Sequence, residues 1–121
     1  MEAATPLEAD AVAAYRALSA RANYLSLDRP DLAFAAKECC RKMAEPSSLD
    51  WAALTRLTRY LAGRPRLVCA FPWQDPGVGL QAFVDTDFAG CVLTRKSTSG
   101  GVCVRGSHLI KHWSNTQTPL P

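Results

Sequence analysis

Residues 81–90, QAFVDTDFAG, and residues 95–101, RKSTSGG, carry the most information about the fold. The first stretch is an apolar run that ends in two acids, and the second is a basic, hydroxyl-rich turn before another apolar run. Asp85 and Asp87 are two residues apart, so on a strand both side chains would project to one face. Clustered carboxylate oxygens are the ligands that hard cations such as magnesium prefer. This pattern predicts a strand whose end could hold a metal ion for phosphate chemistry.

A β-hairpin is predicted farther along the chain. Residues 101–105, GVCVR, and residues 108–113, HLIKHW, flank a Gly-Ser pair, which is typical of a hairpin with a type II′ turn. His108 and His112 lie four apart on the second run, so we expect them on one face, about 13 Å apart and too distant for one metal ion. Residues 67–71, LVCAF, are a further strand candidate. The chain from Leu80 onward is therefore predicted to form a sheet.

The first half of the chain has the pattern of helices. One helix is predicted from Leu7 to about Leu27, and a second starts near Pro30 and ends at Glu45-Pro46. In the first helix we expect these positions to be buried: Val12, Tyr15, Ala22 and Tyr24.

A third helix has the clearest boundaries. Ser47 and Asp50 have the spacing of a capping box at its start, and Gly63 is a plausible stop. Its predicted apolar face consists of Trp51, Leu54, Leu57 and Leu61.

Composition narrows the class of protein. The chain has 121 residues, of which 48% are hydrophobic and 21% charged, so a disordered chain is not expected. The net charge of +3 allows a nucleic-acid partner without requiring one. The five cysteines form no C-x-x-C pair, which favours free thiols in a reducing compartment. No signal sequence and no apolar run of about 20 residues is evident, so we expect an intracellular protein, cytoplasmic or nuclear, without a membrane partner.

Several motifs, taken in order, resemble one family. They are NYL at 23–25 with RPDLAFA at 29–35, Trp51 with LTRYLAG at 57–63, VDTDFAG at 84–90, RKSTSGGV at 95–102, and IKHWS at 110–114 with Gln117. Together they resemble the region that follows reverse transcriptase in copia-type retrotransposon Pol polyproteins, over about residues 12 to 118. The resemblance implies an α+β fold: a helical tether at 1–64, a Pro/Gly-rich hinge at 65–79, and at 80–121 the antiparallel three-stranded start of a truncated ribonuclease H-like domain.

The resemblance also implies a chemistry. Asp85 matches the first catalytic acid of ribonuclease H, an enzyme that degrades RNA in RNA–DNA hybrids with two magnesium ions held among four acids. Of the four acids, only the one matched by Asp85 is present. We therefore expect weak or absent magnesium binding and no cleavage by this chain alone. Asp87 is expected to be a turn residue that binds a backbone N–H group. A three-stranded sheet also needs cover for its apolar face, so marginal stability is expected for the β part.

The basic turn leaves two interpretations open. Its cations and hydroxyls either contact nucleic-acid phosphates or form a solvated turn that caps its own backbone; the residues are Arg95, Lys96, Ser97, Thr98 and Ser99. The expected partners are an RNA–DNA hybrid or another nucleic acid, and the remainder of the polyprotein. One alternative is a nuclease completed by a separate chain. Another is a non-catalytic nucleic-acid-binding module that uses Arg56, Arg59, Arg64, Arg95 and Lys96.

Overall fold

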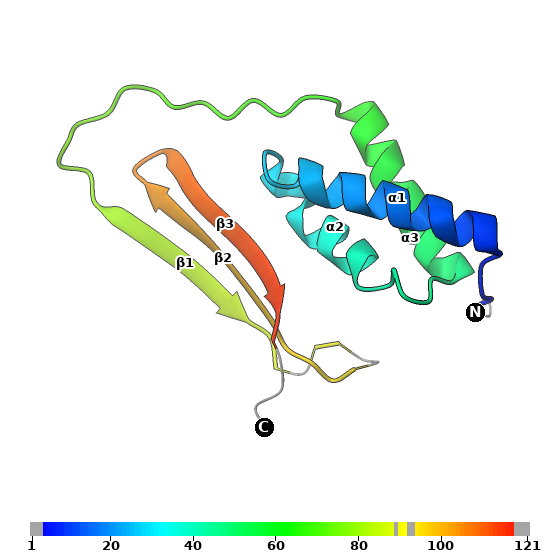
Figure 1. Ribbon diagram of the computed structural model, residues 1–121. Helices are drawn as coiled ribbons and strands as arrows, with labels where there is room; N and C mark the ends of the chain where they lie inside the picture. Colours follow the sequence, from blue (N-terminus) through cyan, green and yellow to red (C-terminus); the bar gives the residue numbers. More distant parts are fainter. Residues whose placement is uncertain (1–3, 89, 92–93, 118–121) are drawn as a thin grey trace. The chain divides into compact units, whose positions relative to one another are not determined.

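The computed structural model describes residues 4–88, 90–91 and 94–117, which form three α-helices followed by a three-stranded antiparallel sheet (Figure 1). The α+β class predicted from the sequence is therefore confirmed. The chain divides into two compact units, Met1–Leu67 and Val68–Pro121, which we call the helical unit and the sheet unit. Parts of the predicted β region lie outside the described residues. They include Ala89, within VDTDFAG at 84–90, and residues 118–121. None of the helices described is both long and apolar enough to cross a membrane.

The helical unit contains α1 (Ala9–Leu25), a 3₁₀ turn (Pro30–Leu32), α2 (Ala33–Cys40) and α3 (Ser48–Gly63). Pro30 occupies the first position of the 3₁₀ turn, where its missing N–H costs nothing. The predicted second helix is shorter than expected, because turns replace it after Cys40.

The predicted capping box is present at the start of α3. The Asp50 carboxylate accepts hydrogen bonds from the Ser47 backbone N–H at 2.8 Å and from the Ser47 hydroxyl at 2.6 Å. These bonds give an otherwise unpaired N–H at the helix start a partner, so they define where α3 begins.

The three helices enclose a small core. Tyr15 is fully buried, and its hydroxyl donates to the Cys39 carbonyl at 2.8 Å. Burial raises the pKa of Tyr15 to about 12. The predicted face of α3 is confirmed, because Leu54 and Leu57 are buried while Trp51 and Leu61 pack against the core. The buried apolar residues are Tyr15, Ala22, Leu32, Ala36, Cys39, Leu54 and Leu57.

The prediction that Tyr24 of α1 is buried is wrong. Tyr24 is 73% exposed, and Val12 is only half-buried. The buried stripe of α1 runs through Tyr15, Ser19 and Ala22, which are spaced by three and four residues. Tyr24 follows Ala22 by two residues, which turns its side chain about 200° around the helix and away from the core.

A network of polar side chains joins the end of α3 to the loop before α2. The Arg29 guanidinium donates to both carboxylate oxygens of Asp31, at 3.0 and 2.8 Å, and the Tyr60 hydroxyl donates to Asp31 at 2.8 Å. Arg29 also donates to the carbonyl of Arg64 at 3.0 Å. The hydrogen bonds from Arg29 hold the pKa of Asp31 at about 2, below its usual 3.8. The RPD and RYL motifs of the sequence therefore meet in one structural contact.

The sheet unit contains β1 (Leu80–Thr86), β2 (Thr98–Arg105) and β3 (His108–Thr116), with β2 in the centre. Gly106 has a φ of +57°, and Ser107 does not share that left-handed backbone. This combination matches the predicted type II′ turn, because the alternative type I′ needs a positive φ at both positions.

The strand predicted at residues 67–71 is wrong. These residues form no ladder with another strand, and Val68 is 86% exposed. Apolar content alone does not make a strand, since the backbone also needs a neighbour to accept its hydrogen bonds.

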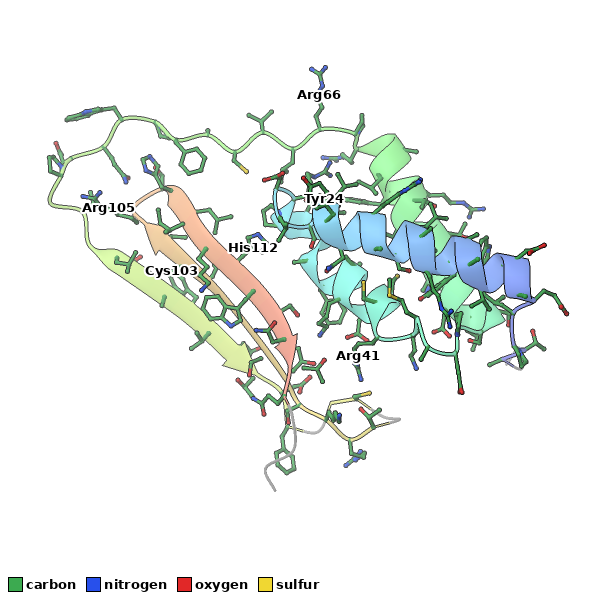
Figure 2. All side chains as sticks on the ribbon, in the orientation of Figure 1. Tyr24, Arg41, Arg66, Cys103, Arg105 and His112 are labelled. Carbon is green, nitrogen blue, oxygen red and sulfur yellow. The ribbon has the colours of Figure 1, made fainter. Side chains whose placement is uncertain are left out.

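A β-bulge overturns the predicted placement of the two histidines. β3 has one extra residue, Ile110, so its pairing with β2 shifts by one position there. His108 pairs with Arg105, whereas His112 pairs with Val102, three residues away along β2. Because side chains alternate along β2 and paired residues share a face, His108 and His112 lie on opposite faces of the sheet (His112 is labelled in Figure 2).

Part of the segment predicted as a hinge is hydrogen-bonded to the hairpin turn. Gln74 donates to the Arg105 carbonyl at 2.8 Å and accepts from the Ser107 N–H at 3.2 Å. The Arg105 side chain, labelled in Figure 2, donates to the carbonyls of Pro76 and Val78 at 2.7 and 3.2 Å. Residues 74–78 therefore belong to the sheet unit.

Candidate functional site

Asp85 lies near the end of β1, opposite Gly100 of β2. Asp85 is exposed, and one of its carboxylate oxygens accepts a hydrogen bond from the Thr86 N–H at 2.9 Å. Gly100 places no side chain directly opposite Asp85 on β2. The carboxylate can therefore be approached from solvent, as a metal ligand that also contacts phosphate must be.

Asp87 has a different role from Asp85. Its N–H donates to the Thr98 carbonyl at 3.1 Å, and its carboxylate accepts the Thr98 N–H at 2.6 Å. The side chain thus binds a backbone N–H group, as the sequence predicts for a turn residue. These two bonds extend the β1–β2 pairing by one step, so Asp87 closes the base of the loop that follows.

The loop between β1 and β2 carries the predicted basic residues. Arg95 has a φ of +53°, which is uncommon for a residue with a side chain. Its N–H donates to the Cys91 carbonyl at 2.7 Å, and the Cys91 N–H donates to the Lys96 carbonyl at 3.2 Å. Arg95 is exposed and Lys96 is half-buried.

Two of the predicted hydroxyl residues, Thr98 and Ser99, are the first residues of β2. Ser99 accepts a hydrogen bond from the Gln117 amide at 2.6 Å, and its oxygen lies 3.3 Å from that of Thr86. The Gln117 N–H donates to the Ser97 carbonyl at 2.8 Å. The Ser99 hydroxyl is therefore used inside the sheet. Gln117 had no local signal for this role in the sequence.

The register brings several of the predicted residues to one end of the sheet. Asp85 pairs with Gly100 and Thr86 with Ser99, so Asp85 lies next to the strand that leaves the basic loop. Within residues 4–88, 90–91 and 94–117, no group of three or more His, Cys, Asp or Glu side chains could hold a metal ion. The described site thus provides an accessible carboxylate beside a basic loop, and a metal ion would need further ligands.

The remaining predicted basic residues belong to the helical unit. Arg56 and Arg59 lie on α3 and Arg64 directly follows it, and all three are exposed.

The chain is similar to Pol polyproteins of plant transposons and to a plant mitochondrial protein. It is 36% identical over 101 residues, 84% of this chain, to the retrovirus-related Pol polyprotein from transposon RE2 of Arabidopsis thaliana. It is 34% identical over 105 residues, 87% of this chain, to the uncharacterized mitochondrial protein AtMg00810 of the same plant. A shorter match, 35% over 72 residues and 60% of this chain, is to the Pol polyprotein from transposon TNT 1-94 of Nicotiana tabacum.

The chain spans only part of these relatives. The matched region is 43% of the length of the mitochondrial protein, 7% of the RE2 polyprotein and 5% of the TNT 1-94 polyprotein. No protein-family model matches the chain, and no solved structure matches it significantly.

Proposed function

Because this chain is homologous to the retrovirus-related Pol polyproteins of copia-type transposons, we propose that its sheet unit begins a ribonuclease H domain that degrades RNA in RNA–DNA hybrids. The observation that carries the proposal is the position of Asp85. An exposed carboxylate lies near the end of a strand, pairs with a glycine across the ladder, and precedes a basic loop. This is the arrangement that an acid needs in order to reach a metal ion and a phosphodiester together.

In this proposal Asp85 is one ligand of a magnesium site. Magnesium, when bound, would activate a water molecule and stabilise the leaving oxygen of the RNA phosphodiester. Further acids would come from the remainder of the polyprotein, since the described residues hold no group of three possible ligands. Magnesium binding by this chain alone is accordingly expected to be weak.

The other residues of the site would position the substrate. The exposed Arg95 and the nearby Lys96 would neutralise phosphate charge along the hybrid. The two hydrogen bonds between Asp87 and Thr98 would hold the base of their loop, so that the cations stay near Asp85.

A chimeric polyprotein tests the role of Asp85. Residues 68–117 replace the matching region of the RE2 Pol polyprotein, and magnesium-dependent cleavage of a labelled RNA–DNA hybrid is measured. We expect the chimera to cleave, and Asp85→Asn to reduce the rate by about 100-fold or more, because a charge-stabilising group is lost. The matched control is Asp75→Asn, a second acid of the sheet unit away from the site, which should leave the rate unchanged.

Two results would overturn this role. One is an Asp85→Asn chimera that cleaves at the rate of the unmodified chimera. The other is equal loss of rate in the Asp75→Asn control, which would indicate damage to the fold.

A second candidate function is nucleic-acid binding without catalysis. The absence of a three-ligand group among the described residues favours it for the chain on its own. Salt-dependent binding of an RNA–DNA hybrid, without turnover at any magnesium concentration, would support it. A flat binding signal at low salt would exclude it.

A further inference from the structure

Residues 51–74 contain no acidic side chain and include most of α3. Between Asp50 and Asp75 the chain has no Asp or Glu but contains four arginines. Their formal charge of +4 exceeds the net charge of +3 for the whole chain. We call these residues, Arg56, Arg59, Arg64 and Arg66, the α3 arginine surface. All four are exposed.

The first two arginines share one face of α3. Arg56 and Arg59 are three residues apart, which places their Cβ atoms about 5–6 Å from one another. The opposite face of the helix carries the buried Leu54 and Leu57. Both guanidinium groups therefore project from the solvent side and can reach neighbouring phosphates of one nucleic-acid strand.

The other two arginines continue the surface beyond the end of α3. Arg29 donates to the Arg64 carbonyl at 3.0 Å and to the Pro65 carbonyl at 3.3 Å, so the backbone that carries them is tied to the helical unit. Figure 2 shows the Arg66 side chain pointing away from the helices.

These arginines are free to bind an anion. The ion pairs found among the described residues belong to Arg29, Lys37 and Arg41, and none includes a member of the α3 arginine surface. Arg29 has four hydrogen bonds to protein oxygens and is not part of it. An arginine guanidinium matches phosphate geometry with two parallel donors, which makes such an unpaired set suited to a phosphate backbone.

The surroundings favour nucleic acid over an acidic protein. Ala52 and Gly63 lie on the same side of α3 as the arginines and are exposed. A protein interface usually has a buried apolar centre. The large apolar residues exposed on α3 are Leu49, in its first turn, and Tyr60, whose hydroxyl is bonded to Asp31.

We propose that the α3 arginine surface binds the sugar-phosphate backbone of an RNA–DNA hybrid, independently of any metal ion. The choice of the hybrid as ligand rests on the proposed function, whereas the surface itself follows from the charges and exposure of its residues. The contact would be insensitive to base sequence, because it involves phosphates only. It would give the helical unit a part in holding the duplex.

Binding without magnesium tests this surface. Fluorescence anisotropy of a labelled RNA–DNA hybrid is measured against the whole chain over a series of KCl concentrations. For Arg56→Gln/Arg59→Gln we expect a loss of affinity of about tenfold or more, and a salt slope smaller by about 1.8, because two phosphate contacts are removed. The control is Arg21→Gln/Lys111→Gln, which removes the same charge from two other exposed positions and should change affinity by less than about threefold. Circular dichroism checks that both variants keep their helices.

Three results would overturn the proposal. They are an unchanged affinity and slope in the α3 variant, an equal loss in the charge-matched control, and equally tight binding of polyglutamate, which would assign the surface to an acidic protein. No cleavage is measured and no metal ion is present, so this test and the chimera test of Asp85 can fail separately.

Discussion

The helical unit and the sheet unit differ in how they exclude water. Tyr15, Leu32 and Ala36 of the helical unit are fully buried, whereas no described residue after Leu57 is buried. All seven residues of β1 are exposed, including Phe83 at 61%. Three short amphipathic helices can close a core around themselves, but a three-stranded sheet offers two faces and covers neither.

This difference has an energetic consequence. Burial of apolar side chains is the main favourable contribution to the free energy of folding. The helical unit buries more apolar side chains than the sheet unit, so this contribution is larger for the helical unit. Hydrogen bonds from Gln74 and Arg105 and the strand ladder hold the sheet unit together. We expect the sheet unit to unfold at the lower urea concentration.

Truncating one large side chain in each unit should give the largest contrast. Leu54 is 2% exposed, so Leu54→Ala should cost the helical unit about 2–5 kcal/mol through lost burial and a cavity. Phe83→Ala, on an exposed strand, should cost about 0.5 kcal/mol. Urea titration followed through the backbone amide NMR signals of each unit measures both. Equal losses for the two variants would mean that the sheet has a core after all.

Adjacent glycines of β2 provide a finer test within the sheet unit. A Cβ added to Gly101 would overlap the indole ring of Trp113, whereas one added to Gly100 meets its nearest neighbour, the Trp113 carbonyl oxygen, at 3.8 Å. Gly101→Ala should therefore cost about 1–3 kcal/mol and shift the Trp113 indole N–H signal in an NMR spectrum. Gly100→Ala is the control and should leave that signal in place. An unmoved indole signal in Gly101→Ala would show that the ring is not held against β2.

The smallest predicted effect concerns Asp31 and is specific to the helical unit. Its pKa of about 2 in the fold, against 3.8 ordinarily, means that the ionised form stabilises the fold above about pH 4 and that this stabilisation is lost as the pH falls toward 2. The pair is partly exposed, so we expect Asp31→Asn to cost about 0.5–1 kcal/mol at pH 6. Urea midpoints of both proteins across this pH range should converge at the acid end. A constant difference across the range would contradict the role of the charge.

Local patterns were sufficient to predict much of the fold. The capping box at Ser47 and Asp50 and the apolar spacing of α3 predicted that helix, because both signals act over a few residues. The Gly-Ser pair predicted the hairpin turn for the same reason. Residues 67–71 show the limit of this reasoning, since an apolar run becomes a strand only when another strand pairs with it.

The candidate site was predictable in its parts but not in its arrangement. The sequence pointed to Asp85 and to the basic turn, and the role predicted for Asp87 agrees with its bond to Thr98. The bond between Gln117 and Ser99 was not foreseeable, because it joins residues 18 apart that no local pattern relates.

The sequence by itself determined most of the elements, their order and the likeness to transposon Pol polyproteins, because periodicity, caps, turns and motifs are properties of neighbouring residues. Only the tertiary structure decided which residues meet. It joined Arg29 and Asp31 to Tyr60 and placed His108 and His112 on opposite faces through the bulge at Ile110. Those outcomes depend on packing and strand register, which arise from contacts between residues distant in the chain.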